Sequence, residues 1–215
     1  MPYPLRLGPA ALTARPSGAL WWADQRLLCV ADLHLGKSER LARRGGALLP
    51  PYEVRATLER LDAEIAATNP AHVICLGDSF DDLQAAGGLE EEARLWLLRM
   101  MAGRQWSWVE GNHDPGPLDL GGSHHGEMHL AGLVFRHEGG GEGLEISAHY
   151  HPKARLAGQS RPCFLTDGRR LILPAFGAYT GGLRLEDPAL QALMGPGALA
   201  ILTGRRCLAV PMPRR

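Results

Sequence analysis

Acidic, amide and imidazole side chains are gathered in five short motifs between residues 32 and 151, and each motif carries groups that bind metal ions. The motifs are Asp32-Leu33-His34, Gly77-Asp78, Gly111-Asn112-His113-Asp114, His137 and His149-Tyr150-His151. Two hard-to-borderline divalent cations about 3.5–4 Å apart need this mixture of carboxylate, amide oxygen and imidazole, with one carboxylate shared between them. The pattern therefore predicts a two-metal hydrolase.

The elements that must position these groups are short apolar runs that are typical of buried strands. One such run precedes each of the first three motifs, over residues 27–30, 73–76 and 106–109. Because buried strands of one sheet end at a common edge, the side chains that follow them can be aimed into a single cleft. We therefore expect these motifs to lie together at the end of a central sheet.

Two of the motifs carry a pair of ligands two residues apart. In a continuing extended strand, Asp32 and His34 would share one face and could bind one ion together. His149 and His151 have the same spacing at a predicted strand end, and His137 ends another predicted strand. Each of these three histidines alone is more typical of a core or surface residue, but their order after the acidic motifs favours a common metal site.

Asp78 is the natural carboxylate to bridge two ions, because it ends a strand and Gly77 lets the backbone approach closely. Taken alone, the motif is equally typical of an aspartate that caps the following turn. Asp81 and Asp82 come soon after it, and we interpret them as loop or cap residues.

The motif Gly111-Asn112-His113-Asp114 is the most specific of the set. The amide oxygen of Asn112 suits a hard metal ion, while the neighbouring histidine can act on the substrate. We expect His113 to be the general acid for the leaving oxygen or a cationic stabiliser of the transition state, with Asp114 raising its pKa and fixing its tautomer. In isolation, the motif could also be a turn beside an incidental histidine.

Two other patterns look like functional motifs and are set aside. Residues 31–38, ADLHLGKS, nearly spell a nucleotide phosphate loop, but Ala31 replaces its first glycine and metal-type ligands occupy its middle. The histidines His124, His125 and His129 lack the helical H-E-x-x-H order of zinc peptidases. We interpret these three as loop or strand surface.

A basic segment directly follows the first motif. Lys37, Arg40, Arg43 and Arg44 are opposed there only by Glu39. Such a local excess of positive charge can hold the backbone of a nucleic acid beside the metals, so these four residues are candidate substrate-binding residues. The alternative is a solvated helix face.

The composition fits a single globular domain that spans all 215 residues. Because 23 basic and 23 acidic residues cancel, no overall field steers the protein to nucleic acid or to an anionic membrane. No apolar run approaches the roughly 18 residues of a membrane span, and Arg6 stands where a signal peptide has its apolar core. Without a C-x-x-C pair, the four cysteines are expected to be reduced thiols in a cytoplasmic protein.

The order of predicted elements places β-α-β units in the first half and mostly strands in the second. Pro50-Pro51 begins an amphipathic helix of about four turns. A second helix is predicted over 89–101 and a third over 188–194, capped by Asp187 and stopped by Gly195. Strands are predicted before residue 25 and over 133–136, 144–149, 163–166, 171–173, 199–203 and 207–210.

These motifs in this order resemble the metallophosphoesterase, or calcineurin-like phosphoesterase, superfamily over residues 26 to about 180. Three longer stretches, ADLHLGKSERLARRGGALLPPYE, EGNHD, and HYHPKARLAGQSRPCFL followed by LILPAFGAYTGG, resemble the bacterial ligase-associated DNA damage response endonucleases of the PdeM type. The resemblance implies an α/β fold, a four-layer α/β/β/α sandwich of two mixed β-sheets flanked by helices. It also implies two divalent metal ions, usually Mn²⁺ with Fe, Zn or Mg as other options.

Carried onto this chain, the resemblance assigns a role to each residue of the motifs. His113, paired with Asp114, would be the catalytic histidine. Ala148 departs from the glycine that commonly precedes the last H-x-H of the superfamily. The first metal would be held by Asp32, His34, Asp78 and His151, and the second by Asp78, Asn112, His137 and His149.

The function implied is a phosphodiesterase or endonuclease that acts on single-stranded or damaged DNA in bacterial repair. The resemblance further suggests an ATP-dependent DNA ligase and a helicase as functional associates, and no membrane. The alternative is a phosphatase, phosphodiesterase or pyrophosphatase for a small nucleotide or lipid-linked substrate, although no long apolar lid is obvious in the sequence. A non-catalytic scaffold is disfavoured because His113 is present.

Overall fold

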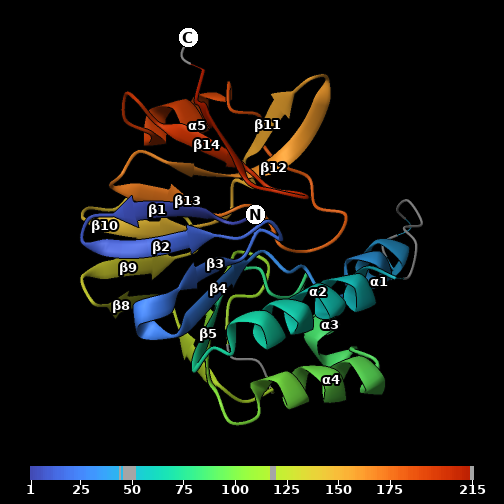
Figure 1. Cartoon of the computed structure of the whole chain (residues 1–215). Helices are drawn as coiled ribbons and strands as arrows, with labels where there is room; N and C mark the ends of the chain where they lie inside the picture. Colours follow the sequence, from blue (N-terminus) through green and yellow to red (C-terminus); the bar gives the residue numbers. More distant parts are fainter. Residues whose placement is uncertain (44, 46–51, 117–119, 214–215) are drawn as a thin grey trace.

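The computed structural model of the protein describes residues 1–43, 45, 52–116 and 120–213. Two β-sheets lie face to face, and most of the helices cover the outer face of the first sheet (Figure 1). Arg44 and Pro50-Pro51, which carried predictions above, lie outside the described residues.

The first sheet is mixed. Its N-terminal strands pair antiparallel up to β4, whereas β4, β5, β6 and β7 are parallel neighbours. The carboxyl ends of β4, β5 and β6 therefore meet at one edge of the sheet. In spatial order the strands are β1 (Tyr3–Leu7), β2 (Ala10–Ala14), β3 (Leu20–Trp22), β4 (Leu27–Ala31), β5 (His72–Leu76), β6 (Gln105–Val109) and β7 (Ser123–His125).

The second sheet is also mixed, and it contains the strands of the C-terminal half. β9, β10 and β13 are parallel neighbours, and the other pairs are antiparallel. β11 (Lys153–Leu156) pairs only with β12, as a hairpin beside the main path. The path runs β15 (Leu208–Pro211), β14 (Leu199–Leu202), β12 (Gln159–Thr166), β13 (Arg170–Ile172), β10 (Leu144–Ser147), β9 (Leu133–Arg136) and β8 (Glu127–Leu130).

Alternate residues of the central strands fill two separate cores. Ile74 and Leu76 of β5 lie in the core between the sheets, together with Phe135 and Phe164 of the second sheet. Val73 points the other way and packs in the core beneath the helices. A strand that is buried on both faces reads as a continuous apolar run, which is the signal that predicted these strands from the sequence.

The outer face of the first sheet is covered by α2 (Glu53–Thr68) and α4 (Glu91–Met101), which match the first two predicted helices. α2 buries Leu58, Leu61 and Ile65 against the sheet. Its C-cap is Asn69, which has a left-handed backbone and donates its N–H to the carbonyl of Ile65. Three short helical segments complete this half, namely η1 (Ala23–Gln25), α1 (Lys37–Arg43) and α3 (Leu83–Gly87).

Among the described residues, one short helix, α5 (Pro188–Leu193), packs on the outer face of the second sheet. As predicted, Asp187 caps it, because its carboxylate accepts the N–H of Ala189 at 2.9 Å. The helix ends one residue before the predicted position, with Met194 as its C-cap. The predicted four-layer sandwich of two mixed sheets is confirmed, with a fourth layer reduced to this six-residue helix.

Candidate metal centre

The residues singled out by the sequence gather where strands from both sheets end. Asp32 directly follows β4, and Asp78 and Asn112 come within three residues of the ends of β5 and β6. From the second sheet, His137 directly follows β9, and the His149-Tyr150-His151 motif follows β10. Five turns from two sheets thus bring the predicted ligands together.

A first cluster of ligand atoms is formed by Asp32, His34 and His151, in which one ligand atom from each lies within 4.8 Å of the others. The Nε2 of His151 is 3.2 Å from the Oδ1 of Asp32 and 3.5 Å from the Nε2 of His34. Within the described part of the chain, this buried Oδ1 has no hydrogen-bond partner. A buried carboxylate oxygen without a donor is costly, and a bound cation would satisfy it.

A second cluster is formed by Asp78, His137 and His149, together with the amide of Asn112. The Nε2 of His137 is 3.3 Å from the Oδ2 of Asp78, and the Nδ1 of His149 is 3.2 Å from the same imidazole nitrogen. The Oδ1 of Asn112 lies 3.0 Å from the Nε2 of His137 and 2.9 Å from the Nδ1 of His149. This set of two imidazoles, one carboxylate and one amide oxygen suits a divalent transition metal.

Asp78 connects the two clusters through one oxygen. Its Oδ2 lies 3.9 Å from the Nε2 of His34 and 3.3 Å from the Nε2 of His137. Its Oδ1 is engaged elsewhere, since it accepts the backbone N–H of His113 at 2.8 Å. Burial alone would raise the pKa of Asp78, but its bonds to His137 and His113 and the charge of His34 hold it at about 2. An ionised oxygen that faces both clusters is what a shared ligand requires.

Five of the ligand positions have a left-handed backbone, which corrects the geometry expected for the paired motifs. The prediction that Asp32 and His34 continue an extended strand is wrong, because β4 ends at Ala31. β10 likewise ends before His149 and His151, which belong to different clusters. Such conformations cost about 1–3 kcal/mol each in non-glycine residues and concentrate at functional sites. The φ angles are 51° (Asp32), 46° (His34), 45° (Asp78), 68° (His149) and 44° (His151).

Two glycines are required by the close packing of the ligand turns. A β-carbon at Gly77 would lie 2.1 Å from the Nδ1 of His137, and its φ is +73°. A β-carbon at Gly111 would lie 2.2 Å from the Oδ1 of Asp78. No side chain fits at either position, so the glycines of the G-D and G-N-H-D motifs let the turns of the two sheets approach.

Asp81 is a functional residue that the sequence analysis missed. It lies in the loop between β5 and α3, as interpreted, but its buried Oδ1 is 2.9 Å from the Nδ1 of His34, so it also contacts a proposed ligand. If Nδ1 carries the proton and donates it to this carboxylate, the Nε2 lone pair of His34 is left facing the cluster. Asp82 does cap α3, by accepting the N–H of Ala85 at 2.8 Å. The signal that could have found Asp81 is the spacing of two aspartates three residues apart after Gly77.

His113 is oriented by a different group from the one expected. Its Nδ1 lies 2.9 Å from the carbonyl oxygen of Asp81, to which it donates, and its ring meets the ring of His34 edge-on at 5.2 Å between centroids. The predicted pairing with Asp114 is wrong. That buried carboxylate instead accepts three backbone N–H groups, from Ser79 at 2.8 Å, Phe80 at 3.1 Å and Gly111 at 3.1 Å.

Asp114 is therefore a positioning residue that ties the turn after β6 to the turn after β5. Burial, together with the negative charge of Asp78, raises the pKa of its carboxyl to about 6, although the three N–H bonds act in the opposite direction. The group acts on the backbone around the ligands and not on the ring of His113.

Residues 25–169 match the sequence profile of the calcineurin-like phosphoesterase family. The chain belongs to this family. A solved structure, that of Pseudomonas putida nuclease MPE, is 28% identical in sequence and superposes with a TM-score of 0.79, covering 98% of this chain and 100% of that one. No curated protein resembles the chain closely enough to count as a match. The protein is accordingly a metal-dependent hydrolase with phosphoesterase or nuclease activity.

The basic segment of this phosphoesterase is largely committed to partners within the chain. Arg40 is ion-paired with Asp81, and Arg43 lies 3.0 Å from the carboxylate of Asp82 and 2.6 Å from the amide oxygen of Gln84. These contacts do not support the predicted phosphate-binding role of the two arginines. Lys37 is half-buried, and no carboxylate of the described residues pairs with it.

The three remaining histidines of the sequence analysis lie away from the clusters. His124 and His125 are in β7, and His129 in β8 bonds Glu127 at 2.9 Å. None of them belongs to a ligand cluster of the described residues. No helix in the part of the chain that the structure describes is long and apolar enough to cross a membrane.

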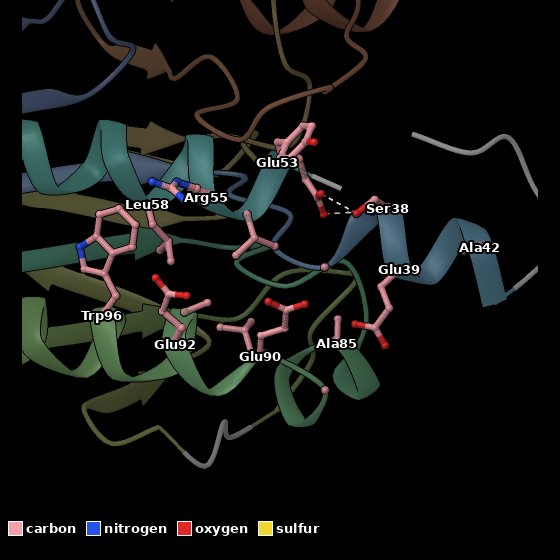
Figure 2. A pocket seen from close by; sticks show the side chains of 16 residues that line it. Ser38, Glu39, Ala42, Glu53, Arg55, Leu58, Ala85, Glu90, Glu92 and Trp96 are labelled. Atoms are coloured by element: carbon pink, nitrogen blue, oxygen red, sulfur yellow. Dashed lines mark hydrogen bonds between the residues drawn. The ribbon is translucent and has the colours of Figure 1, made fainter. Parts of the chain in front are cut away.

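A cavity lies between α1, α2, α3 and α4 (Figure 2). It has a volume of about 910 Å³, and no proposed metal ligand lines it. Leu58, Ala85 and Trp96 contribute apolar surface, whereas Glu90 and Glu92 add carboxylates to its lining (Figure 2). Carboxylates there would repel a phosphate, so the cavity is not a continuation of the phosphoesterase site.

Proposed function

We propose that this protein is a dinuclear phosphodiesterase that cleaves DNA strands, as an endonuclease in bacterial DNA repair. The observation that carries the proposal is the position of the Asp78 Oδ2 between two ligand clusters. Manganese is the proposed metal, with Fe, Zn or Mg as other options. The proposed ligands are Asp32, His34, Asp78 and His151 for one ion, and Asp78, Asn112, His137 and His149 for the other.

Two divalent cations held there would polarise the phosphoryl oxygens and lower the pKa of water. The residues of the chain supply the rest of the chemistry. His113 is proposed to act as an imidazolium, whose Nδ1–H donates to the carbonyl of Asp81 and whose Nε2–H is given to the leaving oxygen. Asp81 orients His34, and Asp114 fixes the turn that carries Asn112 and His113. The reacting groups are thus positioned before substrate arrives.

DNA as substrate is supported by the likeness to the Pseudomonas putida nuclease, which extends over nearly the whole of both chains. A lipid-linked substrate gains no support, because the apolar cavity and the ligand clusters share no described residue. Functional association with a DNA ligase and a helicase, a single domain over the 215 residues, and a cytoplasmic location complete the proposal. All four cysteines are free thiols, as expected in a reducing compartment.

The test is turnover of defined substrates by metal-depleted protein reconstituted with one cation at a time. We expect Mn²⁺ to support internal cleavage of a circular single-stranded DNA, which has no end for an exonuclease. Cyclic nucleotides and a phosphate monoester serve as competing substrates under the same conditions. Turnover confined to these small substrates would overturn the proposal.

A further inference from the structure

The turn over residues 177–182, Gly-Ala-Tyr-Thr-Gly-Gly, spans the distance between the first and the last ligand motif. At its start, the N–H of Gly177 donates to the carbonyl of Asp32 at 3.0 Å. At its end, Gly182 packs so closely on the carbonyl of His151 that a β-carbon would lie 2.1 Å from that oxygen. The turn therefore borders the metal centre, on the side of the Asp32, His34 and His151 cluster.

Tyr179 stands in the middle of this turn in a conformation that its side chain disfavours. Its φ is +56°, which is rare for a bulky aromatic residue, and half of its surface, 50%, is exposed. The residues on both sides of it are held by hydrogen bonds. The N–H of Ala178 donates to the Oγ1 of Thr57 at 3.1 Å, and the ammonium of Lys153 donates to the carbonyl of Thr180 at 2.9 Å. Among the described residues, no aromatic ring stacks on Tyr179. A strained backbone that keeps an aromatic ring in solvent beside a catalytic centre indicates a binding role.

Lys153 brings a positive charge to the same place. It lies two residues after His151, and its ammonium reaches the carbonyl of the residue next to Tyr179. Unlike Arg40 and Arg43, it has no carboxylate partner in the described chain.

We infer that Tyr179 and Lys153 form a nucleotide subsite beside the metal centre, in which the ring stacks on an unpaired base and the ammonium contacts a neighbouring phosphate. Every base has a π-face, so stacking of this kind tolerates any sequence. A base in a duplex is already stacked and paired, which makes the subsite selective for single strands. This inference rests on the proposed function, because it needs a nucleic acid at the centre.

Binding in the absence of metal tests the subsite directly. The probe is a fluorescein-labelled single-stranded oligothymidylate, followed by fluorescence anisotropy in EDTA. We expect Tyr179→Ala to weaken binding roughly ten-fold, and Tyr179→Phe to stay within about two-fold of the wild type. Tyr52→Ala is the matched control, because Tyr52 is also an exposed tyrosine, at 68%, but lines the separate cavity. Equal affinity of the Tyr179→Ala and wild-type proteins would overturn the inference, as would an equal loss in the Tyr52→Ala protein.

The phosphate contact is tested by the salt dependence of the same binding. Lys153→Gln should reduce the slope of log affinity against log salt by about one, whereas Lys153→Arg should retain it. Arg55→Gln is the control, since Arg55 is exposed and already paired with Glu59 at 2.9 Å. An unchanged slope in the Lys153→Gln protein removes this residue from the subsite.

An oligonucleotide with one abasic position separates the subsite from the proposed catalytic function. In Mn²⁺, the Tyr179→Ala protein should lose cleavage at sites with an intact base several-fold more than at the abasic position. Wild-type protein that binds the strand and does not cleave it would refute the proposed function and leave the subsite standing. If the ratio of cleavage at intact positions to cleavage at the abasic position were the same in the wild-type and Tyr179→Ala proteins, the subsite alone would be refuted.

Discussion

The two sheets contribute to the metal centre in different ways. The first sheet supplies the groups that carry charge or amide oxygen, Asp32, Asp78 and Asn112, with His34 as its one imidazole. The second sheet supplies imidazole alone, from His137, His149 and His151. Neighbouring residues hold the first set, because Asp81 engages His34 and the N–H of His113 engages Asp78. The comparison indicates that the first sheet provides the negative charge of the site, whereas the second sheet completes both clusters with imidazole groups.

The largest effect is expected from the shared carboxylate of the first sheet. Asp78→Ala should remove both ions, because its Oδ2 faces both clusters. Metal ions contribute several kcal/mol to charge stabilisation, so activity should fall on the order of a thousand-fold or more. Metal analysis by mass spectrometry measures the loss of ions, and turnover of a DNA substrate measures the loss of activity. Retention of one full equivalent of metal would show that the clusters do not depend on this oxygen.

A ligand of the second sheet should affect one ion only. His149→Ala removes an imidazole from the cluster of Asp78 and His137, while the other cluster keeps its three residues. We expect the metal content to fall from two ions per chain to about one, with a large loss of activity. His129→Ala, which changes an exposed histidine outside both clusters, should keep two ions. Equal metal content in the His149→Ala and His129→Ala proteins would contradict the assignment of His149.

A smaller effect is expected from the group that holds a ligand of the first sheet. Asp81→Asn weakens the partner of His34, and such changes cost about 10–100-fold in metal affinity or activity. Asp82→Asn is the matched neighbour, because that carboxylate caps α3 and does not contact a ligand. We expect it to change stability by about 1 kcal/mol at most while metal affinity is retained. Titration with Mn²⁺ followed by calorimetry compares the two variants, and equal affinities would remove Asp81 from the site.

The smallest effect concerns a histidine at the other end of the first sheet. His72 is buried, and its Nε2 lies 2.9 Å from the Oγ of Ser107. Burial, and secondarily the charge of His125, lowers the pKa of His72 below its usual value of 6.5. As the pH falls below about 6.5, the unfolded chain therefore takes up this proton before the folded chain does, and stability should fall.

This dependence can be measured on metal-free protein by urea denaturation at pH 7.5 and pH 5.5. The wild type should lose more stability between the two conditions than His72→Gln, which cannot titrate. The other histidines are the same in both proteins, so only the difference between the two losses reports on His72. Equal losses would show that the ring takes up its proton in the folded chain as readily as in the unfolded one.

The periodic parts of the fold were predictable from the sequence. Strands buried on both faces and amphipathic helices leave patterns of apolar residues, and α2 and α4 appear where those patterns placed them. The residues that form the candidate ligand clusters could be selected from the sequence because their types and order are typical of metal sites. Cys29 and Cys75 lie in the apolar runs over residues 27–30 and 73–76 that predicted buried strands, and both are fully buried.

The contacts between loops could not be read from the sequence in the same way. The hydrogen-bond partner of His113 is a backbone carbonyl, which cannot be predicted from residue type because every residue has one. Asp32 and His149 have a left-handed backbone where the ligand turns pack against each other. The two-residue spacing of the ligands predicted an extended strand at these positions, and that prediction is wrong. Arg40 looked free to bind phosphate because Asp81, which neutralises it, comes 41 residues later in the chain.

The origin of the ligands in both sheets has a consequence for the whole molecule. At the opposite end, the sheets are held by the apolar side chains between them and by backbone hydrogen bonds such as that from the N–H of Gly8 to the carbonyl of Gly168 at 3.4 Å, whereas cations at the centre would tie the two layers together through bonds to each. Anything that binds only the native state raises its resistance to unfolding by mass action. We therefore expect bound metal to stabilise the contact between the two sheets, so that loss of the metal would increase proteolysis of the protein as well as abolish its activity.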